Sequence, residues 1–125
     1  MEIVERSVFA ESPDVPGPGV ALLRAEVDLD LASVARGERE LRAVAERDPH
    51  CRAVIVEFAP GTFVCVRGLH LLVDFADRLH DTGAHLFACA PPWGLARMLE
   101  ILQIHSELTV VASVPDAMRA ALSEQ

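Results

Sequence analysis

The sequence predicts one α/β domain with a mixed, mostly parallel β-sheet covered by helices. Two segments, 53–58 and 85–90, are short and almost continuously apolar, as in strands that are buried on both faces. Between them, apolar residues recur every three or four positions over 68–82, which is typical of an amphipathic helix. Strands that alternate with helices favour parallel pairing, because each helix carries the chain back across the sheet.

The predicted order of elements is β-β-α-β-α-β-α-β-α, in a single domain that spans residues 1–125. Strands are expected at 3–9, 20–27, 53–58, 85–90 and 108–112. Helices are expected from about 33 to 48, over 68–82, over 93–103 and from 113 onward.

Turn-forming and capping residues set the predicted boundaries. Residues 12–19 contain three prolines and two glycines, which predicts a long loop in a hairpin between the first two strands. Asp30 or Ser33 could cap the first helix by accepting a hydrogen bond from its free first-turn amides. Pro49 ends that helix, because proline disfavours helical geometry in the residue before it. Gly83 suits the C-terminal cap of the second helix.

Composition argues against several classes of protein. The chain has 19 acidic and 11 basic side chains, a formal charge of -8, whereas a nucleic-acid-binding protein normally carries a basic patch. No apolar run reaches the ~18 residues needed to span a bilayer, and the N-terminus does not resemble a secretory signal. The three cysteines form no CxxC pair and give no disulfide framework. We therefore expect a cytoplasmic protein that neither binds nucleic acid nor inserts into a membrane.

Motifs for catalysis and metal binding are missing from the sequence. It contains no Gly-x-Ser-x-Gly elbow, no P-loop and no Gly-x-Gly-x-x-Gly segment. Its five histidines and three cysteines show no ligand spacing such as HxxxH or CxxC. We expect no enzymatic activity, no cofactor and no metal site.

Four stretches in this order resemble the STAS domain family of anti-sigma factor antagonists. Residues 25–28, AEVD, are similar to the family's G-E-L-D turn after the second strand. Residues 54–58, VIVEF, followed by GTF at 61–63, resemble its central strand and turn. Gly68-Leu69 looks like the end of its D-S-S-G-L motif, and Pro115-Asp116-Ala117 matches its final helix. The resemblance runs from about Val20 onward.

The resemblance implies a mechanism that this sequence has altered. In the family, the antagonist binds an anti-sigma factor that is also a protein kinase, and phosphorylation of a serine in the D-S-S-G-L loop breaks the complex. The phosphate adds about two negative charges to the contact surface. Here the D-S-S triplet becomes Cys65-Val66-Arg67, and Val66, at the phosphorylated position, has no hydroxyl. The hypothesis is an antagonist-like adaptor that cannot be phosphorylated there and binds its partner constitutively, or has changed partners.

The expected partner-binding surface combines a turn, a loop and one side of a helix. Its residues are Asp28, Cys65, Val66, Arg67, Gly68, His70 and Asp74, with Asp77 on the same helix. Alternatives remain open for several of them. Asp28 could be a solvated loop acid, the loop could have drifted neutrally after losing its function, and Cys65 could be a reactive thiol or a small hydrophobic residue. Cys51 and Cys89 are expected in the core.

Two other functions are compatible with the same fold. Small STAS domains also resemble the cytoplasmic subunit that binds the ATPase of an ABC-type lipid transporter. A sensor of small anions, bound through Arg67, is a third reading. A homodimer is plausible for a domain with exposed sheet edges.

Overall fold

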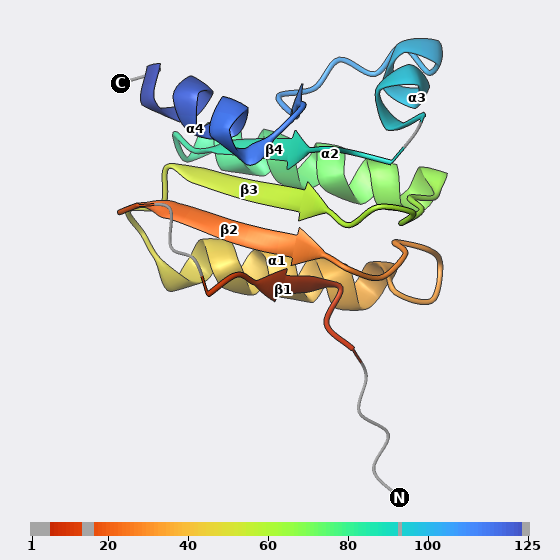
Figure 1. Ribbon diagram of the computed structural model, residues 1–125, viewed down its shortest axis with the longest axis horizontal. Coiled ribbons are helices and arrows are strands. Elements are labelled where there is room, and N and C mark those ends of the chain that lie inside the picture. The colour runs from red at the N-terminus through yellow and green to blue at the C-terminus, as the bar shows by residue number, and fades with distance from the viewer. Residues whose placement is uncertain (1–5, 14–16, 93, 124–125) are drawn as a thin grey trace, which may run out of the picture.

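The computed structural model describes residues 6–13, 17–92 and 94–123, which form a five-stranded sheet with helices on both faces (Figure 1). The strands are β1 (Phe9–Glu11), β2 (Val20–Ala25), β3 (Ala53–Phe58), β4 (His85–Cys89) and β5 (Thr109–Val111), adjacent in that order. The helices are α1 (Val34–Arg47), α2 (Val66–Asp81), α3 (Leu95–Ile101) and α4 (Val114–Ser123). β1 runs antiparallel to β2 and the other pairs are parallel, so the predicted element order and mixed sheet are confirmed.

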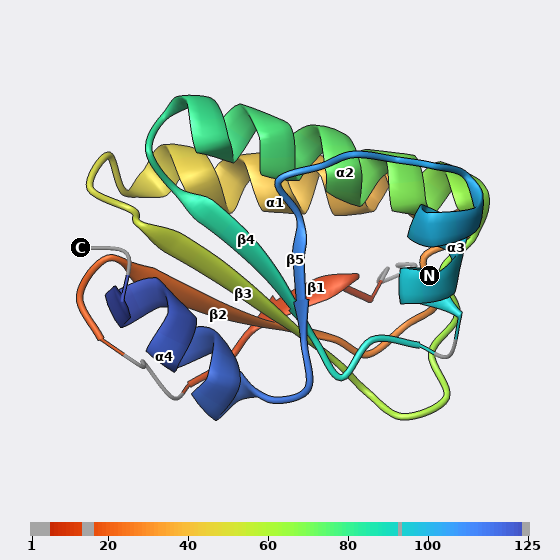
Figure 2. The ribbon, with the colours of Figure 1, turned by 90° about the horizontal axis from the view of Figure 1, so that it is seen from above.

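The helices form two layers of unequal size. α1 and α2 lie side by side on one face of the sheet, and α4 lies on the other (Figure 2). Because side chains alternate along a strand, Val54 and Val56 of β3 pack in the larger cluster on the α1 and α2 side. Ile55, between them, packs with Ala117 of α4. β3 is therefore buried on both faces, which explains its apolar sequence.

The first strand is shorter and lies later in the chain than predicted. Residues 3–5 of the expected strand 3–9 lie outside the described residues, and pairing with β2 begins only at Phe9. Glu40 of α1 explains part of this difference. Its carboxylate oxygen Oε1 accepts hydrogen bonds from the backbone amides of Val8 (2.7 Å) and Phe9 (3.1 Å). The hairpin itself is confirmed, with residues 14–16 of its loop outside the described part.

Helix ends agree with the sequence at two positions. α1 ends at Arg47, two residues before Pro49. Gly83, with φ of 86°, follows α2 in a left-handed conformation, and its amide donates to the carbonyl of His80 (3.0 Å). The next amide, of Ala84, donates to the carbonyl of Leu79 (2.9 Å), which completes a Schellman motif. The third helix, expected over 93–103, is shorter, and residue 93 is outside the described part.

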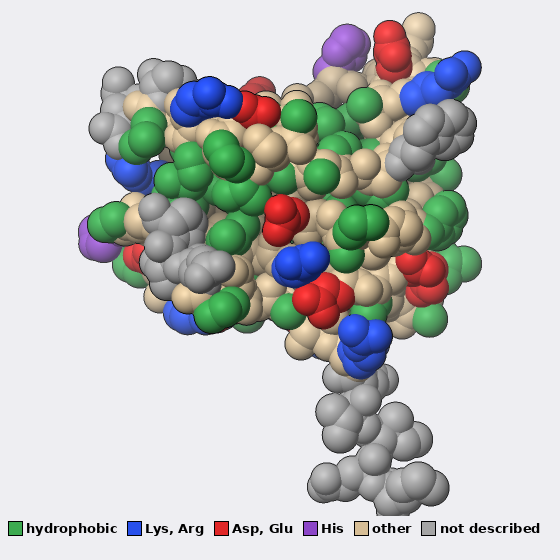
Figure 3. Space-filling view, viewed as in Figure 1, with side chains coloured by type: hydrophobic (Ala, Val, Ile, Leu, Met, Phe, Trp, Pro, Cys, Tyr) green, Lys and Arg blue, Asp and Glu red, His purple; other side chains and the backbone are tan. Residues whose placement is uncertain are grey.

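Part of the sheet face on the α4 side is polar. α4 packs over β3, β4 and β5. Nearer β1, acidic and basic side chains lie next to each other on this face (Figure 3). Arg24 of β2 forms an ion pair with Glu26 (3.6 Å), and both side chains are about half exposed. Charged side chains let this part of the sheet face water without a covering helix.

Candidate functional site

Two connections meet at the end of the sheet toward which the parallel strands point. One joins β2 to α1 and the other joins β3 to α2 (Figure 1). The amide of Leu29 donates to the carbonyl of Phe63 (2.8 Å), and the amide of Cys65 donates to the carbonyl of Leu29 (2.9 Å). These bonds extend the parallel pairing beyond the strands, as a short bridge between Leu29 and Val64. The two connections therefore form one surface.

Asp28 holds the two connections together. Its side-chain oxygen Oδ1 accepts a hydrogen bond from the amide of Phe63 (2.8 Å). Its backbone carbonyl accepts a hydrogen bond from the hydroxyl of Ser33 (2.7 Å). Asp28 is exposed, but one of its carboxylate oxygens is already used within the chain. The structure thus brings Asp28 beside the Cys65 loop, as expected, and gives it a structural role there.

Neither predicted cap of α1 forms in the expected way. Ser33 occupies the N-cap position, but its hydroxyl makes no bond to the first turn of the helix. The hydroxyl instead donates to Asp28 and accepts from the amide of Asp30 (2.9 Å). Asp30 folds back on its own turn, where Oδ1 accepts from the amides of Ala32 (3.0 Å) and Ser33 (3.1 Å). These side chains stabilise the connection rather than the helix.

Cys65 is the N-cap of α2. Its backbone is extended, and its sulfur accepts a hydrogen bond from the amide of Gly68 (3.3 Å). α2 therefore begins at Val66, two residues before the predicted start at Gly68. The half-buried sulfur contributes to the helix end, so this cysteine is more than an inert hydrophobic residue.

Gly68 is buried and allows the two connections to approach each other. A Cβ atom built on Gly68 would lie 2.7 Å from Cγ, 2.8 Å from Cδ2 and 3.0 Å from the carbonyl oxygen of Leu29. Leu29 is itself 2% exposed. Glycine is therefore needed here for packing, and Gly68 does not present a side chain to a partner.

Large apolar side chains are exposed on this surface. Leu31 is 75% exposed, Phe63 57% and Val66 51%. Each lies in, or within two residues of, the bonds that join the two connections. Leu31 and Phe63 were not predicted, because turn residues have no periodicity that reveals their burial. The available signal was a large apolar residue, Leu31, in a short segment between the capping candidates Asp30 and Ser33.

Arg67 adds a positive charge to this surface. It is exposed in the first turn of α2, where no acidic residue is present. Within the part of the chain that the structure describes, Arg67 makes no ion pair. The positive end of the helix dipole lies at the same place, so its potential adds to that of Arg67. Arg67 and the helix N-terminus thus place positive charge on this surface, in a protein whose formal charge is -8.

The exposed side of α2 contains two of the three other residues expected there. His70 and Asp74 are exposed and follow Arg67 at steps of three and four residues, so they share its helix face. Asp77 is only half-exposed. Its Oδ1 accepts hydrogen bonds from the hydroxyl of Ser106 (3.3 Å) and the amide of Glu107 (3.1 Å), so it anchors the segment before β5 instead.

The other cysteines are packed in or against the core. Cys89 is 0% exposed, and burial, with the nearby charges of Glu57 and Asp116, raises the pKa of its thiol to about 11. Cys51 is half-buried against the core, and burial is the main cause that raises its pKa. Among the described residues, no three His, Cys, Asp or Glu side chains are placed to hold a metal ion. No helix in the described ranges is long and apolar enough to cross a membrane.

Comparison with known proteins identifies the family. The sequence model of the STAS domain matches residues 13–117, which include both connections. The NMR structure of the protein TM1081 is similar, with a TM-score of 0.70 and 10% identity, over 98% of this chain and 93% of TM1081. The murine anion transporter Slc26a9, in its inward-facing state, has a similar region with a TM-score of 0.67 and 17% identity. That match covers 84% of this chain and 18% of the transporter. Among curated proteins, no sequence matches. The chain belongs to the STAS domain family.

Proposed function

We propose that this chain is a regulatory protein that binds an anti-sigma factor or a similar kinase-like protein, and that it works without catalysis or a cofactor. The contact surface consists of Leu31, Phe63, Val66 and Arg67, with His70 and Asp74 beside them. The observation that carries the proposal is the exposed Val66 in the first turn of α2, where the resemblance to the family places the phosphorylated serine.

The composition of this surface suits a protein partner. Exposed large apolar side chains that lie near each other are common at protein interfaces, and arginine is enriched there. Arg67 and the N-terminus of α2 favour a carboxylate on the partner. The apolar side chains would supply affinity through burial, and the charge would set the orientation of the complex.

Binding at this surface would not be switched by phosphorylation of the loop. Val66 has no hydroxyl, and the nearest one in the preceding turn belongs to Thr62. That hydroxyl is half-buried and donates a hydrogen bond to the carbonyl of Ala59 (2.9 Å). We propose a constitutive complex, controlled by the amount of either protein rather than by a phosphate.

The test is capture of partners from the source cells by tagged wild type, Arg67→Glu and Arg97→Glu. Arg97 is an exposed arginine on α3 and serves as the matched control. Wild type and Arg97→Glu are expected to capture a kinase-like anti-sigma factor that Arg67→Glu does not capture. An acidic residue in the first turn favours the helix by some tenths of a kcal/mol, so unfolding would not explain the loss. Equal capture by all three would refute the proposed surface.

The captured complex also tests the missing switch. Incubation with ATP should leave wild type without phosphate on residues 61–70. Val66→Ser restores a hydroxyl at the first turn of α2, and we expect a kinase-active partner to phosphorylate it and release it. Phosphate on the wild-type loop would refute constitutive binding.

A role in transport is the second candidate. The similarity to a region of an anion transporter is compatible with it. On this reading the chain is a STAS accessory subunit of an ABC-type lipid transporter, and the capture experiment would recover a permease or an ATPase. Sensing of small anions through Arg67 would instead show as anion binding that Arg67→Ala abolishes.

A further inference from the structure

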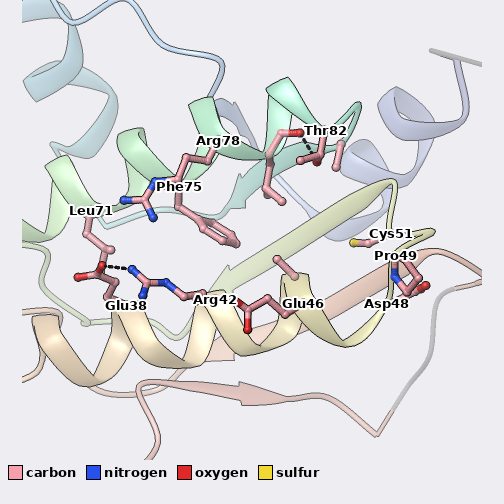
Figure 4. Close-up of a pocket in the computed structure, with 13 residues that line it drawn as sticks. Glu38, Arg42, Glu46, Asp48, Pro49, Cys51, Leu71, Phe75, Arg78 and Thr82 are labelled. Atoms are coloured by element: carbon pink, nitrogen blue, oxygen red, sulfur yellow. Dashed lines mark hydrogen bonds and ion pairs between the residues drawn. The ribbon is translucent and has the colours of Figure 1, made fainter.

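A groove of about 400 Å³ runs between α1 and α2 on the outer side of the helical layer (Figure 4). This volume lies within the range of small-molecule sites, which is roughly 300–1,000 Å³. The residues of α2 that line the groove are Leu71, Phe75, Arg78 and Leu79, and none of them belongs to the proposed partner surface. The two sites share no residue, although Asp74 of the partner surface lies between Leu71 and Phe75 in the sequence.

The inner surface of the groove is apolar. Leu71, Phe75 and Leu79 follow each other at four-residue steps along α2 and form one wall. Ala45 and Ala84, both small, also line the groove, which leaves the space that larger side chains would fill. Burial in these surroundings raises the pKa of the Cys51 thiol, which also lines the groove.

Charges on the rim differ between the two ends. At one end the guanidinium groups of Arg42 and Arg78 extend from facing helices toward Glu38 (Figure 4). Nη2 of Arg42 is paired with Oε1 of Glu38 at 2.6 Å. Within the described ranges, Arg78 has no ion-pair partner. This end therefore carries one uncompensated positive charge.

The acidic residues of the rim lie toward the other end. Glu46 is two turns from Glu38 along α1, about 12 Å at 1.5 Å per residue, and Asp48 follows the helix. Both belong to α1 or the residue after it, so they lie on one wall only. Asp48 already accepts a hydrogen bond from the amide of His50 (2.8 Å). Arg78, at the arginine end, is the charged residue that α2 contributes to the groove.

From this arrangement we infer that the groove binds a small amphipathic carboxylate, with its charged group on Arg78 and its apolar part along Phe75, Leu79 and Ala45. A guanidinium group matches the two oxygens of a carboxylate in a bidentate geometry. A purely apolar groove would bind apolar ligands regardless of their charge. Because Arg78 lies at one end, this groove is expected to prefer a ligand with a negative charge.

Titration of the full chain with decanoate, followed by amide NMR and calorimetry below micelle-forming concentrations, tests the inference. Saturable binding of one decanoate per chain is expected, with the largest shifts at Ala45, Cys51 and Leu79. Decan-1-ol, which has no charge, and decyltrimethylammonium, which has the opposite charge, should bind more weakly. Tighter binding of the cation, or no binding of decanoate, would overturn the inference.

Three variants separate the groove from other surfaces. Arg78→Glu should weaken decanoate binding by about tenfold or more, the effect of one lost charge-assisted hydrogen bond. Ala45→Leu should also weaken it, because the added side chain fills the groove. Arg97→Glu, on α3, should bind decanoate as wild type does. Equal binding by Arg78→Glu and wild type would refute the site, whatever the capture experiment shows for the partner surface.

Discussion

Gly68→Ala is the sharpest test of the contact between the two connections. The added methyl group would lie 2.7 Å from Cγ and 2.8 Å from Cδ2 of Leu29, closer than such atoms approach in proteins. Leu29 cannot swing away, because its side chain is buried. It also cannot shift with its backbone, because its amide and carbonyl are bonded to Phe63 and Cys65. The substitution should therefore force α2 and the β2–α1 connection apart.

The expected loss is the difference between two effects. Overfilling a packed core costs about 1–3 kcal/mol. Alanine is a better helix former than glycine, by up to about 1 kcal/mol, and this offsets part of the cost. Because the contacts are as short as 2.7 Å, we expect a cost in the upper part of that range, about 2–3 kcal/mol. After the offset, Gly68→Ala should lower the free energy of unfolding by about 1–2 kcal/mol. Gly37→Ala should cost less, because its nearest contacts, Phe9 at 3.1 Å and Leu29 at 3.2 Å, are the tips of side chains.

Urea unfolding of a double-mutant cycle measures this contact. Leu29→Ala removes the two carbon atoms that the new methyl group would meet and leaves only the carbonyl oxygen at 3.0 Å. In that background, Gly68→Ala should be neutral or slightly stabilising, which corresponds to a coupling of at least about 1 kcal/mol. If Gly68→Ala were as stable as wild type in the original background, the close approach described above would be wrong.

Asp28, Cys65 and Cys89 each give a stability change of defined sign. Asp28→Ala removes the acceptor of the Phe63 amide and should cost about 1 kcal/mol, whereas Asp74→Ala, on the exposed side of α2, should change nothing in the same urea titration. Cys65→Asp puts a stronger acceptor at the N-cap of α2 and should add about 0.5–1 kcal/mol; a loss would contradict the capping role. The pKa of the Cys89 thiol is raised from 9.0 to about 11 on folding. Ionisation of this thiol therefore leaves the free energy of unfolding unchanged below pH 9 and lowers it as the pH rises from 9 through 11, by about 2–3 kcal/mol in all. The chain has no tyrosine, whose phenolate absorbance would overlap, so the difference in thiolate absorbance between wild type and Cys89→Ala separates this ionisation from those of Cys51 and Cys65. An unchanged alkaline loss in Cys89→Ala would disprove the assignment.

The sequence was most informative where burial is complete. β3 has the predicted bounds because a strand covered on both faces is apolar throughout, and the turn that follows it is marked by proline and glycine. β1 was misplaced because Glu40, more than 30 residues away, binds the amides of Val8 and Phe9. No local pattern records such a contact.

For the candidate site, the sequence identified the segments but not the role of each residue. Asp28 and the Cys65 loop do lie together, as the resemblance to the family implied. Gly68 is buried and packs against Leu29. Helical spacing placed Asp77 on the exposed face, but its carboxylate accepts hydrogen bonds from Ser106 and Glu107. Exposure of Leu31 and Phe63 depends on how two turns pack against each other, which is a tertiary property.

Amide hydrogen exchange of the chain, alone and bound to the captured partner, tests the proposed binding surface most directly. The proposal predicts slower exchange on binding at residues 29–33 and 61–70, where Leu31, Phe63, Val66 and Arg67 lie. Exchange in α4, on the opposite face of the sheet, should not change. Protection of α4 or of β1, with residues 61–70 unaffected, would contradict the account.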